Sequence, residues 1–350
     1  MTAKNLHDIL VKNPVSTSAP CRIDMGGTLD IRSFYFPLRH LEPCTFNLAI
    51  ALRTRVRLEP YKRGWVKVSS RGFDSAAFHE SEMPFSHSLG LIFAVAAYFH
   101  VSGVHILIDS ASPVRSALGG SSVAAVALIT ALSRILEQEG APKLSRSAVA
   151  MLAFAIEQSV AGVNCGIQDM LAATFGGGHV WYWTGQPGKL PYVKRKVIRK
   201  KDHCRLANRL LLAYCGAPHE SVDVNGQWVR KFLEGKYRTI WGEIINKTHQ
   251  FVKCLETFDL IGAGNAMNDE TDLRCEMTPH VLDSIGGRLV AAARKHGCGA
   301  RFTGAGGGGC IWALGNSENI SRLRSAWQTV LDEEENASFL DTTIDPHGVL

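Results

Sequence analysis

A loop of small residues lies near the middle of the chain: Pro113-Val-Arg-Ser-Ala-Leu-Gly-Gly-Ser-Ser-Val-Ala-Ala125. It follows the β-rich run Val104-His-Ile-Leu-Ile-Asp109 and precedes an Ala-rich apolar segment from Ser122 to about Leu136. This order predicts a strand, a loop and a helix whose first turn holds residues 119–122. Backbone N–H groups in the first turn of a helix lack internal partners and lie at the positive end of the helix dipole. We therefore expect a phosphate cradle, with a plain serine cap of the helix as the alternative.

The composition indicates a globular protein with a small-molecule ligand. The chain has 350 residues, of which 46% are apolar and 20% charged, and this length suits two domains. Its formal charge of +6 is mild, whereas a nucleic-acid partner usually needs a denser basic face. No apolar run reaches the ~18 residues of a membrane span. We thus expect neither a nucleic-acid nor a membrane partner, and leave a homodimer open.

Cysteine usage indicates a reducing compartment. The nine cysteines form no C-x-x-C pair and are odd in number, as expected for reduced, mostly buried thiols. The first residues, Met1-Thr-Ala-Lys-Asn-Leu-His-Asp8, contain no signal-peptide core. We expect a cytoplasmic protein without a zinc site.

Hydrophobic periodicity and turn residues predict a chain of mixed α and β structure. Residues 1–18 are expected to form a loose lead-in. The predicted strands are 45–60, 65–69, 104–109, 179–183, 192–201, 209–215, 299–303 and 310–314. The predicted helices are 89–100, 122–136, 144–160, 170–175, 222–251 with a break near Gly235, 281–296 and 320–332. A boundary near residue 200 would give two domains, 1–200 and 201–350.

A second polar segment precedes the central loop: Ser18-Ala-Pro-Cys-Arg-Ile-Asp-Met-Gly-Gly-Thr-Leu-Asp30. Its Gly-Gly pair permits a turn with unusual backbone angles, so that Arg22, Asp24 and Asp30 can point into one pocket. Carboxylate acceptors and a forked guanidinium donor suit a polyhydroxylated ligand. The alternative is a surface turn with a salt bridge.

Two acids after the central loop are candidates for chemistry. Glu157 lies late in a predicted helix, where a carboxylate opposes the helix dipole and needs a compensating partner. Asp169 follows the turn Gly162-Val-Asn-Cys-Gly-Ile-Gln168, which can aim its carboxylate into a cleft. The alternatives are a structural ion pair for Glu157 and an N-cap of helix 170–175 for Asp169.

A glycine run near the end, Gly304-Ala-Gly-Gly-Gly-Gly309, satisfies the dinucleotide-binding pattern G-x-G-x-x-G literally. That pattern requires a helix immediately after the glycines, whereas a strand is predicted here. We therefore interpret the run as a hairpin whose backbone passes close to the phosphate cradle or to a ligand, and expect the hairpin within roughly 15 Å of the cradle.

The ordered segments resemble the GHMP kinase family, named for galactokinase, homoserine kinase, mevalonate kinase and phosphomevalonate kinase. The segment Ala19-Pro-Cys-Arg-Ile-Asp24, with its glycines and Asp30, resembles the first, substrate-binding motif; residues 113–124 resemble the phosphate loop; Phe302–Cys310 resembles the third motif. Residues 157–169 are similar to a galactokinase segment that supplies a magnesium-binding Glu and a catalytic Asp. The resemblance covers about 19 to 315. It implies a two-domain α+β fold with an N-terminal ribosomal-protein-S5-like domain and a ferredoxin-like C-terminal domain.

The chain departs from the family pattern at four places. Arg115 and Ala117 replace two expected glycines of the phosphate loop, and Gly120 replaces an expected serine. We expect a changed loop shape and a guanidinium at position 115 that can reach a phosphate. The first motif is one residue short between Arg22 and Asp30, which leaves the role of Asp30 open.

The resemblance implies ATP and Mg²⁺ as cofactors. The ATP phosphates would lie on Arg115, Ser116, Ala117, Gly119, Gly120, Ser121 and Ser122. Magnesium, a hard cation, would bind Ser121 or Ser122 together with Glu157. Asp169 would accept the proton of the attacking hydroxyl, and the substrate would bind Arg22, Asp24 and Asp30.

The first motif looks more like that of the sugar kinases than of the isoprenoid or homoserine kinases. Its Gly-Gly-Thr-Leu-Asp run is similar to that of the heptose 7-phosphate kinase and fucokinase branch, which phosphorylates the anomeric hydroxyl. A phosphorylated sugar would need further cations, for which Arg32, Arg39 and His40 are candidates by position. The rival hypothesis is a non-catalytic sugar and ATP sensor of the same fold. ATP-dependent decarboxylation fits the first motif less well.

Overall fold

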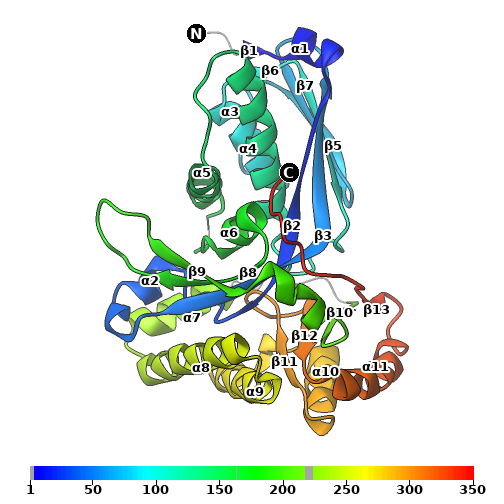
Figure 1. The fold of residues 1–350 in the computed structure, drawn as a ribbon. Helices are drawn as coiled ribbons and strands as arrows, with labels where there is room; N and C mark the ends of the chain where they lie inside the picture. The colour runs from blue at the N-terminus through cyan, green and yellow to red at the C-terminus, as the bar shows by residue number, and fades with distance from the viewer. Residues whose placement is uncertain (1–3, 163, 217–223) are drawn as a thin grey trace.

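The computed structural model describes residues 4–162, 164–216 and 224–350, and its largest element is a mixed seven-stranded sheet (Figure 1). At its centre is the 17-residue strand β3 (Cys44–Pro60), which pairs with β2 (Val15–Met25) along most of its length. One end of β3 also pairs with β7 (Val104–Ser110), and the other pairs with β8 (Gly178–Trp183). The sheet is completed by β4 (Trp65–Ser70), β5 (Phe73–His79) and β9 (Tyr192–Ile198).

The helices α3 to α6 cover one side of this sheet (Figure 1). The most deeply buried is α4 (Gly120–Gln138), which begins where the sequence predicts the phosphate cradle. Around it lie α3 (Gly90–Tyr98), α5 (Arg146–Val160) and α6 (Gln168–Phe175). Within the described residues, α4 is the one helix with the length and apolar composition of a membrane span, and 67% of that apolar window is buried inside the protein.

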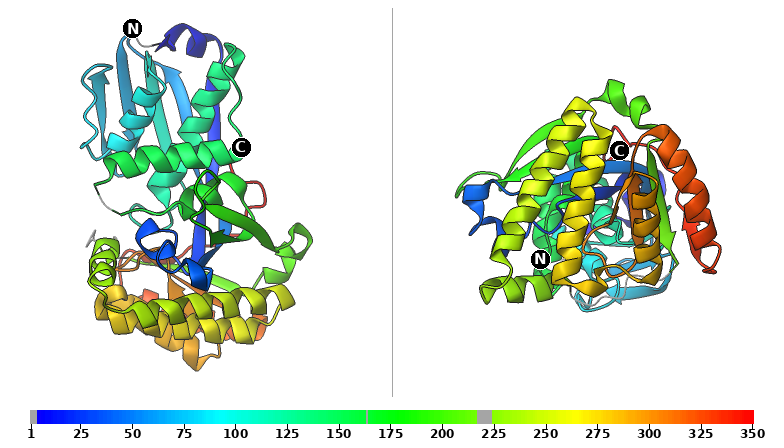
Figure 2. Two further views of the ribbon diagram at one scale, coloured as in Figure 1. Left: turned by 90° about the vertical axis from the view of Figure 1, so that its left-hand side faces the viewer. Right: turned by 90° about the horizontal axis from the view of Figure 1, so that it is seen from below.

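The second half of the chain builds a smaller antiparallel sheet with the order β11-β12-β10-β13. Its strands are β10 (Leu210–Cys215), β11 (Gly299–Phe302), β12 (Cys310–Leu314) and β13 (Ala337–Phe339). Its helices are α7 (Val224–Leu233), α8 (Arg238–Thr257), α9 (Leu260–Met277), α10 (Ser284–Lys295) and α11 (Ser317–Leu331). Figure 2 shows α8 and α9 side by side. These two sheets with their helices make the expected two-domain α+β fold, whereas the boundary near residue 200 stays a prediction.

Short elements complete the chain. They are β1 (Lys4–Asn5), α1 (His7–Lys12), α2 (Arg32–Tyr35), β6 (Val101–Ser102) and the 3-10 turns η1 (Arg39–Leu41), η2 (Lys200–Leu206) and η3 (Pro279–Val281). The last residues return to the first sheet, where the backbone N–H of Leu350 donates to the carbonyl of Ser18 at 2.9 Å.

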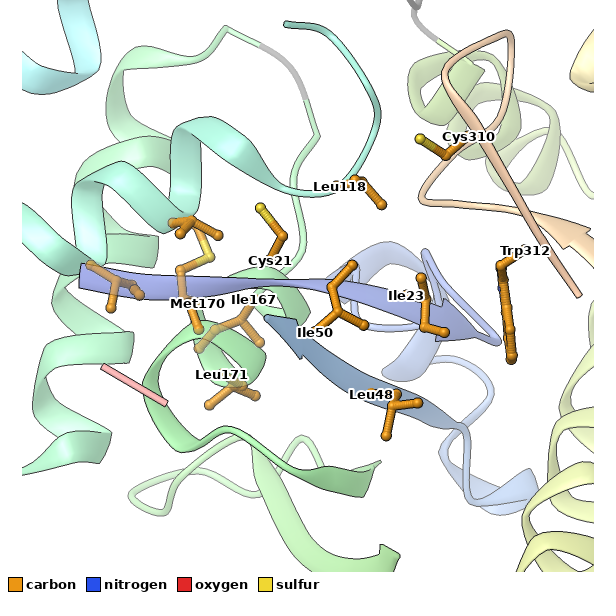
Figure 3. Packing of buried hydrophobic residues seen from close by; sticks show 14 of the residues in the cluster. Cys21, Ile23, Leu48, Ile50, Leu118, Ile167, Met170, Leu171, Cys310 and Trp312 are labelled. Atoms are coloured by element: carbon orange, nitrogen blue, oxygen red, sulfur yellow. The ribbon is translucent and has the colours of Figure 1, made fainter. Parts of the chain in front are cut away.

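The core is continuous between the two halves. Figure 3 shows the side chains of β2 and β3 between α6 on one side and β12 on the other, with Cys21, Ile23, Leu48 and Ile50 close to Met170 and Trp312. Each of these side chains is at most 2% exposed. Strand β2 carries the first polar motif, so the motif is anchored in the part of the core that both halves share.

The structure corrects two expectations about the elements and confirms a third. The described part of residues 1–18 is a short strand, a helix and the start of β2 rather than a loose lead-in. The predicted break near Gly235 is confirmed, since α7 ends at Leu233 and α8 begins at Arg238; residues 222 and 223 of that predicted helix lie outside the described residues. Helix α9 was not predicted, because the residues it buries include Glu270, Thr271 and Arg274, so that its inward face shows no apolar stripe.

Candidate functional site

A cavity of about 530 Å³ lies where the central loop, the first motif and the start of α6 meet. Its described lining includes Arg22, Thr28, Asp30, Arg71, Arg115, Ser116, Ala117, Gly119, Gly120, Ser121, Ser122, Glu157, Cys165, Gly166, Gln168, Asp169, Asn225 and Gly304. The residues predicted to bind ATP, to bind Mg²⁺ or to act on the acceptor all line this one cavity, as do Arg22 and Asp30 of the first motif, whereas Asp24 does not.

The central loop ends at the N-terminus of α4. The N-cap is Gly119, with φ of +83° and no side-chain cap, so the alternative of a serine cap is wrong. The first-turn N–H groups of α4 therefore have no capping side chain, which suits an anion. The two serines differ in setting: Ser121 is exposed, whereas Ser122 is buried and donates its hydroxyl to Glu157 Oε2 at 2.7 Å.

The two residues that replace glycines keep a glycine-like backbone. Arg115 has φ of +55° and Ala117 has φ of +59°, both in the left-handed region that disfavours residues with a Cβ. The expectation of a changed loop shape stays a prediction, but the backbone at these two positions is of the kind that glycine adopts most readily. Such a conformation costs of the order of 1–3 kcal/mol and persists only where the surroundings fix it. One contact that constrains the loop comes from Arg22, whose Nη1 donates to the carbonyl of Ala117 at 2.7 Å.

Asp169 lies beside the loop. The N-cap of α6 is Ile167 without a side-chain cap, so the N-cap alternative for Asp169 is also wrong. Its Oδ1 accepts from Arg22 Nε at 2.7 Å, and a Cβ added to Gly119 would lie 3.0 Å from its Cγ. Burial alone would lower the pKa of Arg22, but the charges of Asp169 and Asp24 raise it. A permanently charged guanidinium therefore orients a partly exposed carboxylate next to the N-terminus of α4.

Asp24 lies outside the cavity in which the sequence placed it. It was expected to bind substrate, but its side chain has no exposed surface and lies outside the cavity lining. Oδ1 accepts from the backbone N–H of Gly304 at 2.8 Å, and Oδ2 accepts from Arg301 Nη1 at 3.0 Å. Because both oxygens are already occupied, we assign Asp24 a structural role.

Asp30 is buried but lines the cavity. Its Oδ2 accepts from the backbone N–H of Gln168 at 2.9 Å, while Oδ1 has no hydrogen-bond partner within the described structure. Burial raises the pKa of Asp30 to about 7, and the nearby charge of Asp169 adds to the rise. Gly166 is required beside it, because a Cβ there would lie 1.7 Å from Asp30 Oδ2.

Glu157 is half-buried beside the first turn of α4. Burial raises its pKa to about 7, against the lowering effect of the Ser122 hydrogen bond, and Asp169 adds to the rise. The described structure pairs Glu157 with a hydroxyl rather than with Lys or Arg, so the alternative of a structural ion pair is not what the geometry shows. The two side chains together offer oxygen ligands at a helix N-terminus.

The glycine hairpin packs on the central loop. It connects β11 to β12, as expected, and no helix follows it. A Cβ added to Gly309 would lie 2.8 Å from the carbonyl oxygen of Ser116, and one added to Gly304 would lie 3.3 Å from that of Ala117. The expected proximity of hairpin and loop is confirmed, and close backbone approach explains the glycines.

Sequence reasoning missed some lining residues and misplaced others. Arg32, Arg39 and His40, proposed from position as cations for a substrate phosphate, are exposed and outside the cavity lining. Arg71 and Asn225 do line it, the first from the turn between β4 and β5 and the second from α7. Only the tertiary structure could have identified these two, because no motif surrounds them.

Known proteins resemble this chain in sequence and in fold. The family model of the GHMP kinases N terminal domain matches residues 88–177, and that of the GHMP kinases C terminal domain matches residues 251–333. A mevalonate kinase of Pyrococcus horikoshii is 29% identical over 291 residues, covering 76% of this chain and 80% of the relative. A probable glucuronokinase of Arabidopsis thaliana is 28% identical over 204 residues, covering 57% and 54%. The structure of Lactococcus lactis galactokinase complexed with galactose superposes with a TM-score of 0.73 at 18% identity, covering 99% and 98%.

The chain belongs to the GHMP kinase family and has its two-domain fold. It is an ATP-dependent kinase that transfers phosphate to an alcohol, in a family that typically uses Mg²⁺. The sequence favoured the sugar-kinase branch, whereas the curated relatives include mevalonate kinases at about 29% identity as well as the glucuronokinase. Family membership therefore leaves the alcohol open.

The raised pKa of Asp30 predicts a pH-dependent stability. The folded state holds the proton up to about pH 7, whereas the ordinary pKa of the side chain is 3.8. The contribution of Asp30 to the free energy of unfolding should therefore be largest below about pH 4 and should fall as pH rises to 7, by up to about 4 kcal/mol. We expect Asp30→Asn to flatten this slope in urea unfolding between pH 5 and 7.5.

Glu157 titrates in the same range, so Glu157→Gln is the matched comparison. Each single variant should remove part of the slope and the double variant most of it. An Asp30→Asn slope equal to that of the unmodified protein would show that Asp30 keeps an ordinary pKa.

Proposed function

We propose that this protein is a sugar kinase that transfers the γ-phosphoryl group of ATP to a hydroxyl of a monosaccharide, with the anomeric hydroxyl as the target. The observation that carries the choice of substrate is Asp30. Its Oδ1, which has no hydrogen-bond partner within the described structure, is a buried acceptor in the cavity wall. Its Oδ2 accepts from the backbone N–H of Gln168, the residue before Asp169. A sugar hydroxyl can donate to Oδ1.

The charge of the cavity supports a neutral acceptor over an anionic one. Asp30 and Asp169 are close enough for each charge to be felt by the other, and a hydroxy acid such as mevalonate would add a third carboxylate beside them. The described cations of the lining are Arg22, Arg71 and Arg115, of which Arg22 is already paired with Asp169. This distribution favours a free sugar over a sugar phosphate such as a heptose 7-phosphate.

The ATP phosphates would lie on the backbone of residues 115–122, at the uncapped N-terminus of α4. Ser121, Ser122 and Glu157 suit Mg²⁺, because hydroxyl and carboxylate oxygens are the donors that this hard ion prefers. When bound, the ion would neutralise charge on the transferred phosphoryl group. Glu157 would release its proton to serve as a ligand, so metal binding should strengthen with rising pH.

Asp169 would act on the acceptor. Its carboxylate lies beside Gly119, where the phosphates would begin, and Arg22 fixes its orientation through Nε. A carboxylate held there can orient the sugar hydroxyl and take its proton as the bond to phosphorus forms. Positioning of the two substrates would supply most of the rate, as is usual in phosphoryl transfer.

A panel of acceptors tests the substrate class. With ADP release as readout and NMR of the product, we expect turnover with at least one of the neutral sugars D-galactose, D-mannose and L-fucose, and a new phosphate on the anomeric carbon. Turnover with D-glucuronate and with none of the neutral sugars would overturn the preference for a neutral acceptor. Turnover with R-mevalonate and with none of the sugars would overturn the proposal. Turnover with D-glycero-D-manno-heptose 7-phosphate alone would restrict it to phosphorylated sugars.

Asp169→Asn separates a kinase from a sensor. The amide keeps the shape and part of the hydrogen bonding but cannot take the proton, so kcat should fall by roughly 10²–10⁴-fold while both substrates still bind. Calorimetry of ATP and sugar binding is the control. A non-catalytic sensor would instead bind both ligands without sugar-dependent ADP release even in the unmodified protein, and equal turnover of variant and unmodified protein would remove Asp169 from catalysis.

Arg115→Gly tests the guanidinium at the loop. Glycine tolerates the left-handed backbone, so the free energy of unfolding should rise by about 1 kcal/mol. Loss of a charged hydrogen bond to a phosphate should raise KM for ATP roughly tenfold. Arg115→Lys keeps the charge and the backbone strain, and should show neither the gain in stability nor the full rise in KM. An unchanged KM in Arg115→Gly would show that the side chain does not reach ATP.

A further inference from the structure

The turn that carries Asp30 contains a backbone outlier. Thr28 has φ of +71°, although a β-branched side chain makes the left-handed region especially unfavourable. Its side chain is buried and lines the cavity. The backbone N–H of Ile31 donates to the carbonyl of Thr28 at 3.0 Å, which closes the turn around Asp30. A change at Thr28 would therefore move the carboxylate proposed to bind the acceptor.

A buried arginine from the second domain holds this turn. Arg274 of α9 donates through Nη2 to the carbonyl of Gly27 at 2.7 Å and through Nη1 to the hydroxyl of Thr28 at 2.9 Å. The guanidinium has no exposed surface. The guanidinium of Arg274 thus binds two successive residues, one of which is Thr28 with its strained backbone.

The side chain of Arg274 is held by an ion pair and by two aromatic rings. Arg274 Nε donates to Glu270 Oε1 at 2.8 Å, one helical turn earlier, and its guanidinium carbon lies 4.8 Å from the Trp228 ring and 4.7 Å from the Trp241 ring. Burial alone would raise the pKa of Glu270, but Arg301 and Arg274 lower it. The carboxylate is therefore charged and keeps the fork aimed at the turn.

We propose that Arg274 is a positioning residue for the acceptor: it holds the strained Gly27-Thr28 peptide so that Asp30 faces the cavity. The phosphate loop is fixed by other contacts, among them Arg22 on Ala117 and the glycine hairpin on Ser116. Loss of the Arg274 grip should therefore weaken binding of the acceptor and leave binding of ATP nearly unchanged. The direction of this effect rests on the proposed role of Asp30.

Thr28→Val and Thr28→Ser form the matched pair. Valine keeps the volume and the β-branch but loses the hydroxyl that Arg274 binds, whereas serine keeps the hydroxyl. Both leave the pair of Arg274 with Glu270 in place, so both are expected to fold. Arg274→Lys keeps the charge but loses the fork, and tests the same contact from the other side.

The first measurement needs no acceptor. Hydrogen–deuterium exchange of the peptide that contains residues 27–31 should be at least tenfold faster in Thr28→Val and in Arg274→Lys than in the unmodified protein, and unchanged in Thr28→Ser. Exchange in β7 and α4 is the internal control and should not move. Equal exchange in Thr28→Val and Thr28→Ser would overturn the proposal.

The second measurement uses the sugar with the highest turnover in the acceptor panel. Loss of a hydrogen bond to a charged group should raise its KM roughly tenfold in Thr28→Val, with KM for ATP within about twofold and Thr28→Ser near the unmodified protein. A parallel rise of both KM values would indicate a merely structural contact.

A double-mutant cycle excludes direct contact of the Thr28 hydroxyl with the sugar. If Arg274 acts through Thr28, Thr28→Val combined with Arg274→Lys should raise KM little more than the stronger single variant. Effects that multiply would assign the hydroxyl to the sugar and overturn the proposal. Asp30→Asn is the independent check. An unchanged KM for the sugar in this variant, together with fast exchange in Thr28→Val, would contradict the proposed role of Asp30. It would leave intact the conclusion that Arg274 holds the turn.

Discussion

A carboxylate with no exposed surface, that of Asp24, joins the parts of this kinase on which the site depends. It accepts from the backbone of the glycine hairpin and from Arg301 of β11, and lies 3.4 Å from Arg22 of its own strand. Breaking a buried ion pair by removing one partner typically costs 3–5 kcal/mol, and Asp24 takes part in two such pairs. The first motif, the hairpin and the second sheet are therefore held in one fixed arrangement.

The charges continue from Asp24 in both directions. Arg22 leads to Asp169 in the cavity, and Arg301 leads to Glu270, which also binds Arg274. The chain of contacts runs from the catalytic candidate through the interior to the turn that bears Asp30. Asp169 and the turn that bears Asp30 are thus both held by one buried network, half of whose members belong to the second half of the chain. This explains why α9 buries polar residues, which would otherwise destabilise a helix core.

Two residues of the central loop adopt backbone angles that usually require glycine. Arg115 and Ala117 adopt left-handed angles because contacts on either side leave the chain little choice: Arg22 binds the carbonyl of Ala117, and the hairpin glycines press against the carbonyls of Ser116 and Ala117. Strain of this kind persists where the surroundings over-determine the conformation. Arg115 thereby brings a guanidinium to the lining of the cavity that the first turn of α4 also lines.

The resemblance carried by three separated motifs predicted the class of fold and the grouping of Arg22, Asp30, Glu157 and Asp169 around one cavity. The sequence by itself also determined that a helix begins at the central loop and that the glycine run is not a dinucleotide site. The helix start and the glycine hairpin follow from local signals. A small-residue loop between a strand and a helix, or glycines between two strands, can be recognised from the neighbouring residues alone. Only the tertiary structure decided that Asp24 is structural, that α9 is a helix and that Arg274 reaches Thr28 over a separation of 246 residues. Buried polar contacts leave no periodic pattern in the sequence, since each is defined by a partner that the chain brings near only when both domains have folded.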